Sequence, residues 1–265
     1  MSRVSVVIPL FNDCSHIERA IRSALKQAAL KEIIVVDDCS TDESCSVVER
    51  LALDHEALRL LRLEQNGGPA VARNFGASIS QGEFLCFLDS DDEFLDNYFS
   101  EVMPMLDANP EVHAFKVGME YFDPVKGYIL PPYDPRYVAV VFSSACNVMI
   151  RRASFMKTGG FPSDPVFRAS RGGEDAAFCS ALAKYMAPLG RIDKAYYRCW
   201  SYAGSHVDRF LANTRLANNQ DGFEFVLLGI DQQPGGALEE AIEKFSRNVS
   251  ANLAKYKQAS VQSSN

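Results

Sequence analysis

The feature that most constrains the fold is an apolar run at residues 84–88 (Phe-Leu-Cys-Phe-Leu) that stops at a cluster of acids. Asp89, Asp91 and Asp92 follow within four residues of its end. A continuous apolar run of this length predicts a strand buried on both faces, as in the centre of a parallel sheet. Because open α/β sheets bind ligands at the carboxyl edge of their strands, we expect a ligand site where this strand ends.

The acidic cluster itself has two interpretations. Carboxylates spaced Asp-x-Asp repel one another, so that one of them tends to take up a proton. A divalent cation removes this repulsion, and Mg²⁺ or Mn²⁺ held by one or two carboxylates typically takes further ligands from substrate phosphates. The alternative is an ordinary turn or helix cap, where Asp and Ser are common. The segment alone does not choose between a metal site and a turn.

The fold class follows from strand-like runs that alternate with helical patterns. The expected strands cover residues 4–9, 32–36, 58–63 and 84–88. The expected helices cover residues 15–27, 40–53 (opened by a Ser40-x-x-Glu43 capping box) and 96–108, with another after the Gly-Gly-Pro turn at 67–69. Strands that alternate with helices imply right-handed crossovers, so we predict an α/β fold with a mainly parallel central sheet flanked by helices.

The second half of the chain is less regular. Its expected elements are a strand at 112–121, a proline-rich connection at 130–135, two strand-like runs within 137–150, glycine-rich loops at 159–162 and 170–173, a helix from Glu174 to about 187, a strand and polar loop at 196–206, and an amphipathic helix at 237–257. This half is therefore expected to be irregular, with a helical extension at its C-terminal end.

Composition excludes several classes of protein. The chain has 265 residues, 47% of them hydrophobic, which is enough for one large domain or one domain with a smaller appendage. A net charge of −7 argues against a nucleic-acid-binding surface. The N-terminus lacks a signal-like segment, and no stretch reaches the ~20 apolar residues of a membrane span. Seven cysteines without a Cys-x-x-Cys pair fit reduced thiols, so we expect a cytoplasmic protein with at most peripheral contact with the inner face of the membrane.

Five ordered sequence blocks resemble those of glycosyltransferase family 2. They are Val-Ile-Pro-x-Phe-Asn at 7–12, Ile-Val-Val-Asp-Asp-x-Ser-Thr-Asp at 34–42, Gly-Gly-Pro-Ala-x-Ala-Arg-Asn at 67–74, Leu-Asp-Ser-Asp-Asp at 88–92, and Gly-Glu-Asp at 173–175. The resemblance extends over roughly residues 3–200 and implies the GT-A fold of nucleotide-diphospho-sugar transferases. It also implies sugar transfer with inversion at the anomeric carbon, with Mn²⁺ or Mg²⁺ at the Asp-x-Asp block.

The resemblance suggests a division of the chain. We expect a catalytic domain over residues 1–205, with a nucleotide-binding half at about 1–110 and an acceptor-side half at about 111–205. The helical extension would then occupy residues 206–265.

The nucleotide-binding residues are assigned from the matching blocks. Asp38 is expected to accept a hydrogen bond from a nucleobase N–H, although it also suits the N-terminal end of a helix. Pro9 and Phe11 would line the base pocket, where Phe11 offers a stacking face but also fits an ordinary core. Arg73 would reach the diphosphate or hold Asp89, and its alternative is a surface arginine. The resemblance places Asp89 and Ser90 at the nucleotide.

The metal ligands are expected in the acidic block. In the family the last acid of the motif binds the metal directly, and here Asp91 and Asp92 cannot be separated for that task. Many members also place a histidine shortly after a Tyr-Arg pair. In this chain the pair is followed by Trp200, so His206 would have to act from a shifted position or is a surface histidine. Trp200 and Tyr202 are candidates for an acceptor-binding wall.

Asp175 is the expected general base. Displacement at an anomeric carbon requires the acceptor hydroxyl to lose its proton as it attacks opposite the leaving group. The second acid of the Glu-Asp block has this role in the family. Capping of the helix that follows Gly173 is the structural alternative.

We therefore expect an inverting, metal-dependent transferase that uses a nucleotide-diphosphate sugar. A UDP-sugar is favoured because uracil N3 carries the hydrogen that Asp38 would accept, and the acceptor would be a saccharide or a lipid-linked saccharide. A nucleotidyltransferase would need a glycine-rich loop with Arg or Lys after the first strand, where residues 9–12 read Pro-Leu-Phe-Asn. A non-catalytic sugar-nucleotide-binding relative remains an open alternative.

Overall fold

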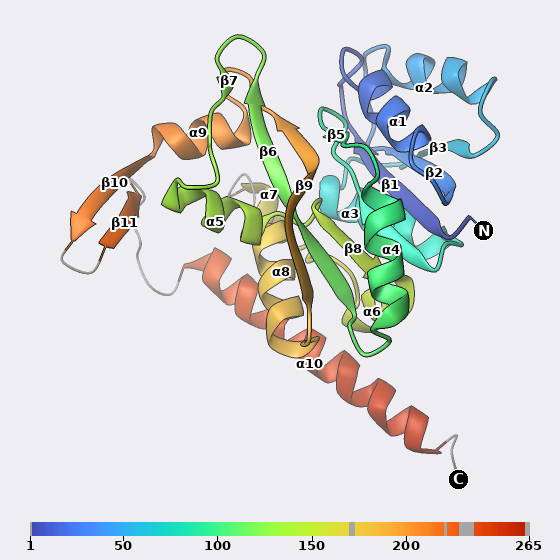
Figure 1. The fold of residues 1–265 in the computed structure, drawn as a ribbon. Helices are drawn as coiled ribbons and strands as arrows, with labels where there is room; N and C mark the ends of the chain where they lie inside the picture. Colours follow the sequence, from blue (N-terminus) through green and yellow to red (C-terminus); the bar gives the residue numbers. More distant parts are fainter. Residues whose placement is uncertain (1, 170–172, 220–221, 228–235, 263–265) are drawn as a thin grey trace.

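The computed structural model describes residues 2–169, 173–219, 222–227 and 236–262. A central sheet has the strand order β3-β2-β1-β4-β8-β6-β9-β5, and β7 pairs with β6 (Figure 1). Its strands are β1 (Val4–Leu10), β2 (Leu30–Asp37), β3 (Leu58–Arg62), β4 (Phe84–Phe87), β5 (Glu93–Phe94), β6 (Ala114–Asp123), β7 (Gly127–Tyr128), β8 (Val148–Arg151) and β9 (Gly190–Trp200). A separate hairpin is formed by β10 (Thr214–Asn219) and β11 (Gly222–Leu227).

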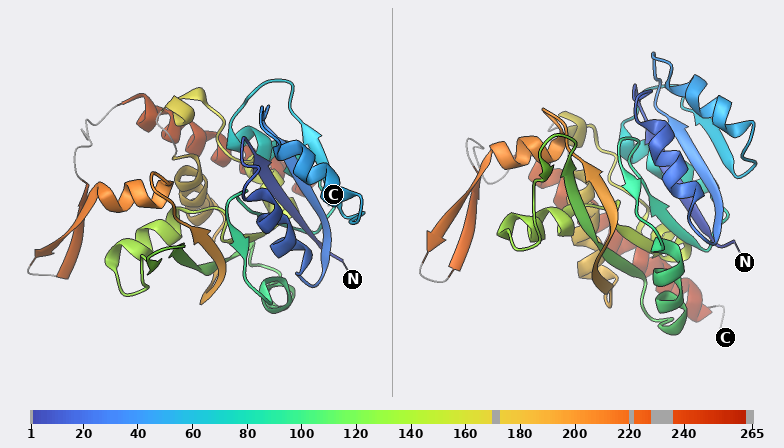
Figure 2. Two further views of the ribbon diagram at one scale, coloured as in Figure 1. Left: turned by 90° about the horizontal axis from the view of Figure 1, so that it is seen from above. Right: turned by 45° about the horizontal axis from the view of Figure 1, so that its top comes forward.

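Helices flank this sheet. They are α1 (Ile17–Leu25), α2 (Ser44–Ala52), α3 (Pro69–Ile79), α4 (Tyr98–Ala108), α5 (Pro135–Ser143), α6 (Arg152–Thr158), α7 (Pro165–Ala169), α8 (Glu174–Tyr185), α9 (His206–Ala212) and α10 (Ala237–Gln262). The views of Figure 2 separate α1, α2 and their strands from the half that carries α5, α8 and α9. The predicted α/β fold with flanking helices is confirmed.

The N-terminal half of the sheet is parallel, as its alternation of strands and helices predicts. β1 pairs in parallel with β2 and β4, and β2 with β3. Every residue of β1 and β4 is buried, which is why both read as continuous apolar runs. Since the strands run the same way, the segments that follow β1, β2 and β4 meet at one edge of the sheet.

The other half is mixed. β8 is antiparallel to both β4 and β6, whereas β6 and β9 are parallel. After the acidic loop the chain forms β5, which pairs with the end of β9. This pairing brings the far half of the sheet to the acidic loop.

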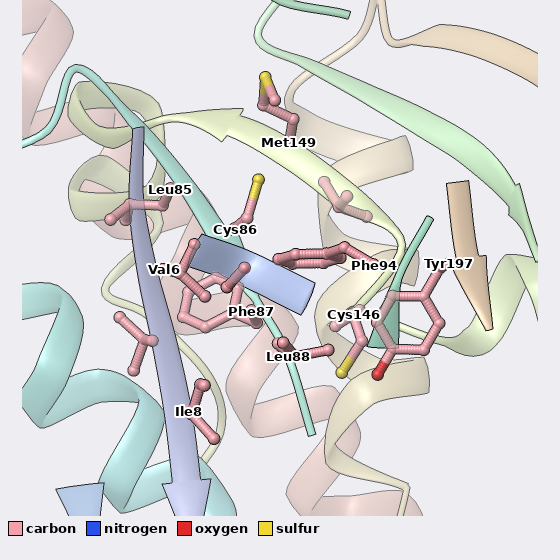
Figure 3. Packing of buried hydrophobic residues seen from close by; sticks show 14 of the residues in the cluster. Val6, Ile8, Leu85, Cys86, Phe87, Leu88, Phe94, Cys146, Met149 and Tyr197 are labelled. Atoms are coloured by element: carbon pink, nitrogen blue, oxygen red, sulfur yellow. The ribbon is translucent and has the colours of Figure 1, made fainter. Parts of the chain in front are cut away.

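The core continues across the junction of the two halves. Figure 3 shows Val6 and Ile8 of β1 packed toward Leu85 and Phe87, with Met149 of β8 close to Cys86. The residues of this core are almost fully buried. The sheet therefore forms one continuous support beneath the carboxyl edge.

Three local predictions were wrong or incomplete. Residues 135–143 form α5 and not a strand, because Pro135 stands at the first helical position and the Asp134 carboxylate accepts the Arg136 N–H. The expected Ser40-x-x-Glu43 capping box is absent: α2 begins at Ser44, and the Ser44 N–H binds the Asp42 carboxylate at 3.0 Å. The helical extension is present as α9 and α10, with the hairpin β10–β11 between them.

The C-terminal helix packs along the body of the protein. α10 contacts α6, α7 and α8, and its last turns project beyond them (Figures 1 and 2). Asn252 donates a hydrogen bond to the Thr158 carbonyl at 3.2 Å, and the Tyr185 and Ser246 hydroxyls are 3.0 Å apart. This helix is therefore part of the packed structure.

None of the helices in the described ranges combines the length and apolar character that crossing a membrane requires. All seven cysteines are free thiols, as expected for this composition.

Gly118 allows the closest approach within the mixed half of the sheet. A Cβ atom at this position would lie 2.3 Å from the Asp193 carbonyl oxygen, and the β6–β9 register shifts here. We expect Gly118→Ala to lower the free energy of unfolding by about 2 to 3 kcal/mol, because backbone atoms cannot move aside as a flexible side chain can. Urea unfolding would measure this loss. Gly236→Ala is the matched control, since nothing lies within 4 Å of its Cβ position; equal stability of the two variants would contradict the prediction.

Candidate active site

The predicted site residues gather around one cavity of about 720 Å³ at the carboxyl edge of the sheet. Nine of the ten line it: Pro9, Phe11, Asp38, Arg73, Asp89, Ser90, Asp91, Asp92 and Asp175. They come from the segments after β1, β2 and β4 and from the first turns of α3 and α8. The blocks at the ends of β1, β2 and β4 meet here as the parallel topology requires, and the mixed half of the sheet brings the start of α8 to them.

Arg73 connects the two ends of this constellation. Its guanidinium donates to Asp89 at 2.6 Å and to Asp175 at 2.9 Å. Arg73 is only 4% exposed, so it is a buried cation and not the surface arginine of the alternative interpretation. Burial alone would lower its pKa, but the Asp175 and Asp89 carboxylates raise it well above the usual value. The acidic loop and the start of α8 are therefore joined through one charge.

Asp175 is oriented from two sides. One carboxylate oxygen accepts from Arg73, and the other accepts from the Ala145 backbone N–H at 3.2 Å. The preceding Gly173 caps α8 in a left-handed conformation with φ of 105°, which glycine adopts without strain. Asp175 also stands in the first turn of α8, where the helix dipole favours a carboxylate, so the capping and catalytic interpretations are compatible.

Asp92 is turned into the protein. It accepts a hydrogen bond from the Tyr197 hydroxyl at 2.7 Å and from the Trp200 N–H at 2.8 Å. Burial, together with the charges of Asp91 and Asp89, raises the pKa of Asp92 well above its usual value. Asp92 is thus a buried acid that fastens the acidic loop to the end of β9.

Asp91 has different surroundings. No other described residue donates a hydrogen bond to its carboxylate. Burial, and then the neighbouring charges of Asp89 and Asp13, raise the pKa of Asp91 to about 6. Its carboxylate is therefore the member of the acidic block that gains most from a nearby positive charge.

Asp13 and His16 belong to the same edge and were not assigned from the sequence. The Ser90 hydroxyl donates to one Asp13 oxygen at 2.6 Å, and His16 Nδ1 lies 2.5 Å from the other. The His16 ring also stacks on Tyr202 with centroids 4.8 Å apart. Asp13 follows β1 as Asp38 follows β2, and this position was a signal that could have identified it.

Asp38 orders the turn that begins α3. Its two carboxylate oxygens accept the N–H groups of Gly67 at 2.6 Å and Gly68 at 2.8 Å. Asn66 donates to the Asp38 carbonyl at 2.7 Å. Each oxygen keeps a second lone pair that can accept a hydrogen bond from a nucleobase N–H. This contact with a nucleobase stays a prediction.

The two residues expected beside the base differ in burial. Pro9 is buried in β1, whereas Phe11 is 52% exposed at the rim of the cavity. Phe11 is therefore not a core phenylalanine, and one face of its ring is available for stacking.

The segment after β9 does not form the expected acceptor wall. The Trp200 ring is covered by the Arg19 guanidinium, 4.4 Å from its centroid, and by the edge of Phe122 at 5.3 Å. Tyr202 is occupied by its stacking on His16, and neither residue lines the cavity, where Cys199 stands instead. His206 begins α9, but its side chain lies outside the described part of the structure.

The donor set fits a hard divalent cation only with help from a ligand. Within the described ranges, no group of three His, Cys, Asp or Glu side chains is arranged to hold a metal ion. Asp89 and Asp92 are taken up by Arg73, Tyr197 and Trp200, which leaves Asp91 available. One carboxylate plus substrate phosphates is a common arrangement for Mg²⁺ or Mn²⁺.

The central sheet and its flanking helices form an α/β fold of the GT-A type. The family model of glycosyl transferase family 2 matches residues 5–160. The chain belongs to this family.

The chain is also similar to individual proteins, over different fractions of its length. An uncharacterized glycosyltransferase of Haemophilus influenzae is 26% identical over 240 residues, or 84% of this chain and 75% of that protein. Glycosyltransferase GlyG of Streptococcus pneumoniae serotype 4 is 37% identical over 95 residues, or 36% and 32% of the two chains. The crystal structure of Staphylococcus aureus TarS 1-349 in complex with UDP-GlcNAc superimposes with a TM-score of 0.63 and 26% identity. That alignment covers 77% of this chain and 60% of the TarS fragment.

The raised pKa of Asp91 predicts how stability changes with pH. A carboxyl group with a higher pKa in the folded than in the unfolded protein does not change the free energy of unfolding at a pH below its unfolded-state pKa. As pH rises from about 4 to about 6, it lowers the free energy of unfolding progressively. Asp91→Asn should therefore increase the free energy of unfolding at about pH 8 without metal by on the order of 1 to 3 kcal/mol, with little change at about pH 4. Urea unfolding at both pH values would measure the effect.

Asp89→Asn is the matched variant, and it should change the free energy of unfolding in the opposite direction. It removes one of the carboxylates that neutralise buried Arg73, which are those of Asp89, Asp175 and, at 4.0 Å, Glu174, so stability at about pH 8 should fall by about 2 kcal/mol. A destabilised Asp91→Asn protein, or a stabilised Asp89→Asn protein, would contradict this account of the acidic loop.

Proposed function

We propose that this protein is an inverting, metal-dependent glycosyltransferase whose donor is a nucleotide-diphosphate sugar, most specifically a UDP-sugar. The charge of the cavity carries the proposal. Two arginines, Arg73 and Arg168, face seven acids in its lining: Asp38, Asp89, Asp91, Asp92, Asp164, Glu174 and Asp175. A diphosphate would be repelled by this surface without an added cation, and the family to which the chain belongs transfers sugars.

Asp91 is the proposed direct ligand of Mn²⁺ or Mg²⁺. Asp92 is less suited because both of its oxygens accept hydrogen bonds inside the protein. When bound, the ion would neutralise charge that develops on the departing diphosphate. Asp89 holds Arg73, and Ser90 is tied to Asp13, so these neighbours fix the direction of the loop.

Asp175 is the proposed general base. It accepts the proton of the acceptor hydroxyl as that oxygen attacks the anomeric carbon from the face opposite the leaving group. Arg73 and the Ala145 N–H fix the carboxylate, which lowers the entropic cost of reaching the reactive geometry. The reaction breaks the bond between the anomeric carbon and the diphosphate oxygen and forms the new glycosidic bond with inversion.

The donor base and the acceptor follow from the walls of the cavity. Asp38 and Phe11 suit uracil, and TarS, with a similar fold and 26% identity, was crystallised with UDP-GlcNAc. The acceptor-side wall is uncharged, with Met119, Tyr121, Val140, Ser143 and Ser144. We propose that it receives a hydroxyl of a saccharide or lipid-linked saccharide, the latter at the inner face of the membrane. The catalytic domain would comprise residues 1–205, braced by the extension at 206–265.

A panel of nucleotides tests the proposed donor. We expect UDP with Mn²⁺ to raise the Tm more than CDP with Mn²⁺, since uracil N3 carries a hydrogen that the Asp38 carboxylate can accept and cytosine N3 does not. GDP, CDP and dTDP, each with and without Mn²⁺, are the comparison. Stabilisation by GDP alone would overturn the uracil assignment, and equal stabilisation by UDP with and without metal would overturn metal dependence.

Asp175→Asn separates an enzyme from a protein that only binds sugar nucleotides. The variant should keep its affinity for UDP and Mn²⁺ within about threefold and lose sugar transfer by on the order of a hundredfold or more. Calorimetry and release of UDP from UDP-sugars would measure the two effects. Asp193→Asn, which changes an exposed carboxylate outside the cavity, is the matched control; unchanged turnover in Asp175→Asn would contradict the assignment.

Asp91→Asn and Asp92→Asn form a matched pair for the metal. Asp91→Asn should weaken Mn²⁺-dependent binding of UDP by about tenfold or more, because it removes the available charged ligand. Asp92→Asn should retain most of this binding, since the amide oxygen can accept from the Trp200 N–H and the amide nitrogen can donate to the Tyr197 hydroxyl. Titration of Mn²⁺ at fixed UDP would compare them, and the reverse order would assign the metal to Asp92.

A further inference from the structure

Arg168 is the second cation of the cavity, and its surroundings differ from those of Arg73. It lies on α7, with its side chain across Gly68, where an added Cβ would lie 2.9 Å from Arg168 Cδ. Nη1 donates to the Asn66 carbonyl oxygen at 2.9 Å, and Nη2 donates to the Asn66 side-chain oxygen. A residue of the far half of the chain is thus in contact with the turn that begins α3.

The partners of Arg168 are neutral. No carboxylate of a described residue lies within ion-pair distance of its guanidinium, although acids dominate the cavity. Arg73, in contrast, is paired with Asp89 and Asp175. Arg168 can therefore exchange a neutral oxygen for an anion without leaving a buried acid unpaired.

The neighbouring backbone cannot supply the same donors. Glycine-rich turns before helices often bind phosphates through their own N–H groups. Here the N–H groups of Gly67 and Gly68 are already bound by the Asp38 carboxylate. The charged hydrogen-bond donor next to this turn is the Arg168 guanidinium, and a charge-assisted bond to a phosphate is stronger than its present bonds.

The C-terminal helix holds α7 in this position. Phe167, only 3% exposed, packs in a small cluster with Ala177 of α8 and Ala241 of α10. Lys244 of α10 lies 3.8 Å from Asp164, just before α7. Packing against α8 and α10 therefore fixes the backbone of α7, from which the Arg168 side chain extends. A fixed backbone lowers the entropy that Arg168 loses when it binds a ligand.

We infer that Arg168 binds the diphosphate of the donor nucleotide, as a protein-supplied cation in addition to the metal. This inference rests on the proposed function. The ligand is a nucleoside diphosphate: its base would lie against Asp38 at the Gly67–Gly68 turn, and its diphosphate between Arg168 and Asp91, which line the same cavity.

The test compares a ligand that has the diphosphate with one that lacks it. Calorimetry would measure the affinities of UDP and uridine, each with Mn²⁺, for the wild-type protein and for Arg168→Gln and Arg168→Lys. We expect Arg168→Gln to bind UDP about tenfold more weakly and uridine as the wild type does, and Arg168→Lys to retain most of the UDP affinity. Arg247→Gln is the control, because Arg247 is exposed on α10 and pairs with Glu243.

Each outcome decides the inference. Unchanged UDP affinity in Arg168→Gln would overturn it, and so would equal losses for UDP and uridine, which indicate a contact with the nucleoside or a loosened α7. If the variant has a lower Tm without ligand, the ratio of the two affinities still decides, because a displaced α7 affects both ligands. A wild-type protein that binds no nucleoside diphosphate would overturn the proposed function as well, so the two failures are distinguishable.

Discussion

The buried guanidinium of Arg73 is the interaction on which the site depends. A cation that is 4% exposed is stable only if opposite charges compensate for its lost hydration, and Asp89 and Asp175 do so from separate elements. Asp89 follows β4, Asp175 begins α8, and Arg73 stands one turn into α3. The charge of one buried side chain therefore holds the acidic loop and the start of α8 together.

The acidic loop is held at three of its four polar positions. Asp89 is bound by Arg73, Ser90 by Asp13, and Asp92 by Tyr197 and the Trp200 backbone. These partners lie on α3, on the segment after β1 and on β9, so the loop is fixed from three directions. Asp91 is the position that remains, and burial, followed by the charges of Asp89 and Asp13, raises its pKa. The fold thus leaves one carboxylate of the loop without the protein donors that hold its neighbours.

The sequence predicted the regular half of the fold well. β1, β2 and β4 are buried on both faces, so their side chains carry an unbroken apolar signal. Residues 135–143 read as a strand because Tyr137 and Val141 are buried among β-branched neighbours, and the helix is decided by Asp134 and Pro135 at its start. Local capping outweighed composition at this helix.

The sequence blocks indicated which residues meet at the cavity and that Arg73 could hold Asp89, but they did not indicate the other connections. Periodicity places Asp38, Asp89 and Asp91 at strand ends, because parallel topology is a local consequence of alternating strands and helices. The pairing of Arg73 with Asp175 spans 102 positions and depends on how the mixed half folds back, which no local pattern encodes. The same reason explains why Asp92 could not be separated from Asp91, since the distinction lies in Tyr197 and Trp200 of a distant strand.

The arrangement also explains why the second half of the chain belongs to the active site. The family model ends at residue 160, yet the partners that orient Asp92, the expected base Asp175 and the cation Arg168 all follow that point. Each stands on β9, α8 or α7, and α10 packs on two of these elements. The buried charge of Arg73 therefore joins two halves of the chain, because its partner Asp89 lies within the matched residues and its partner Asp175 lies beyond them.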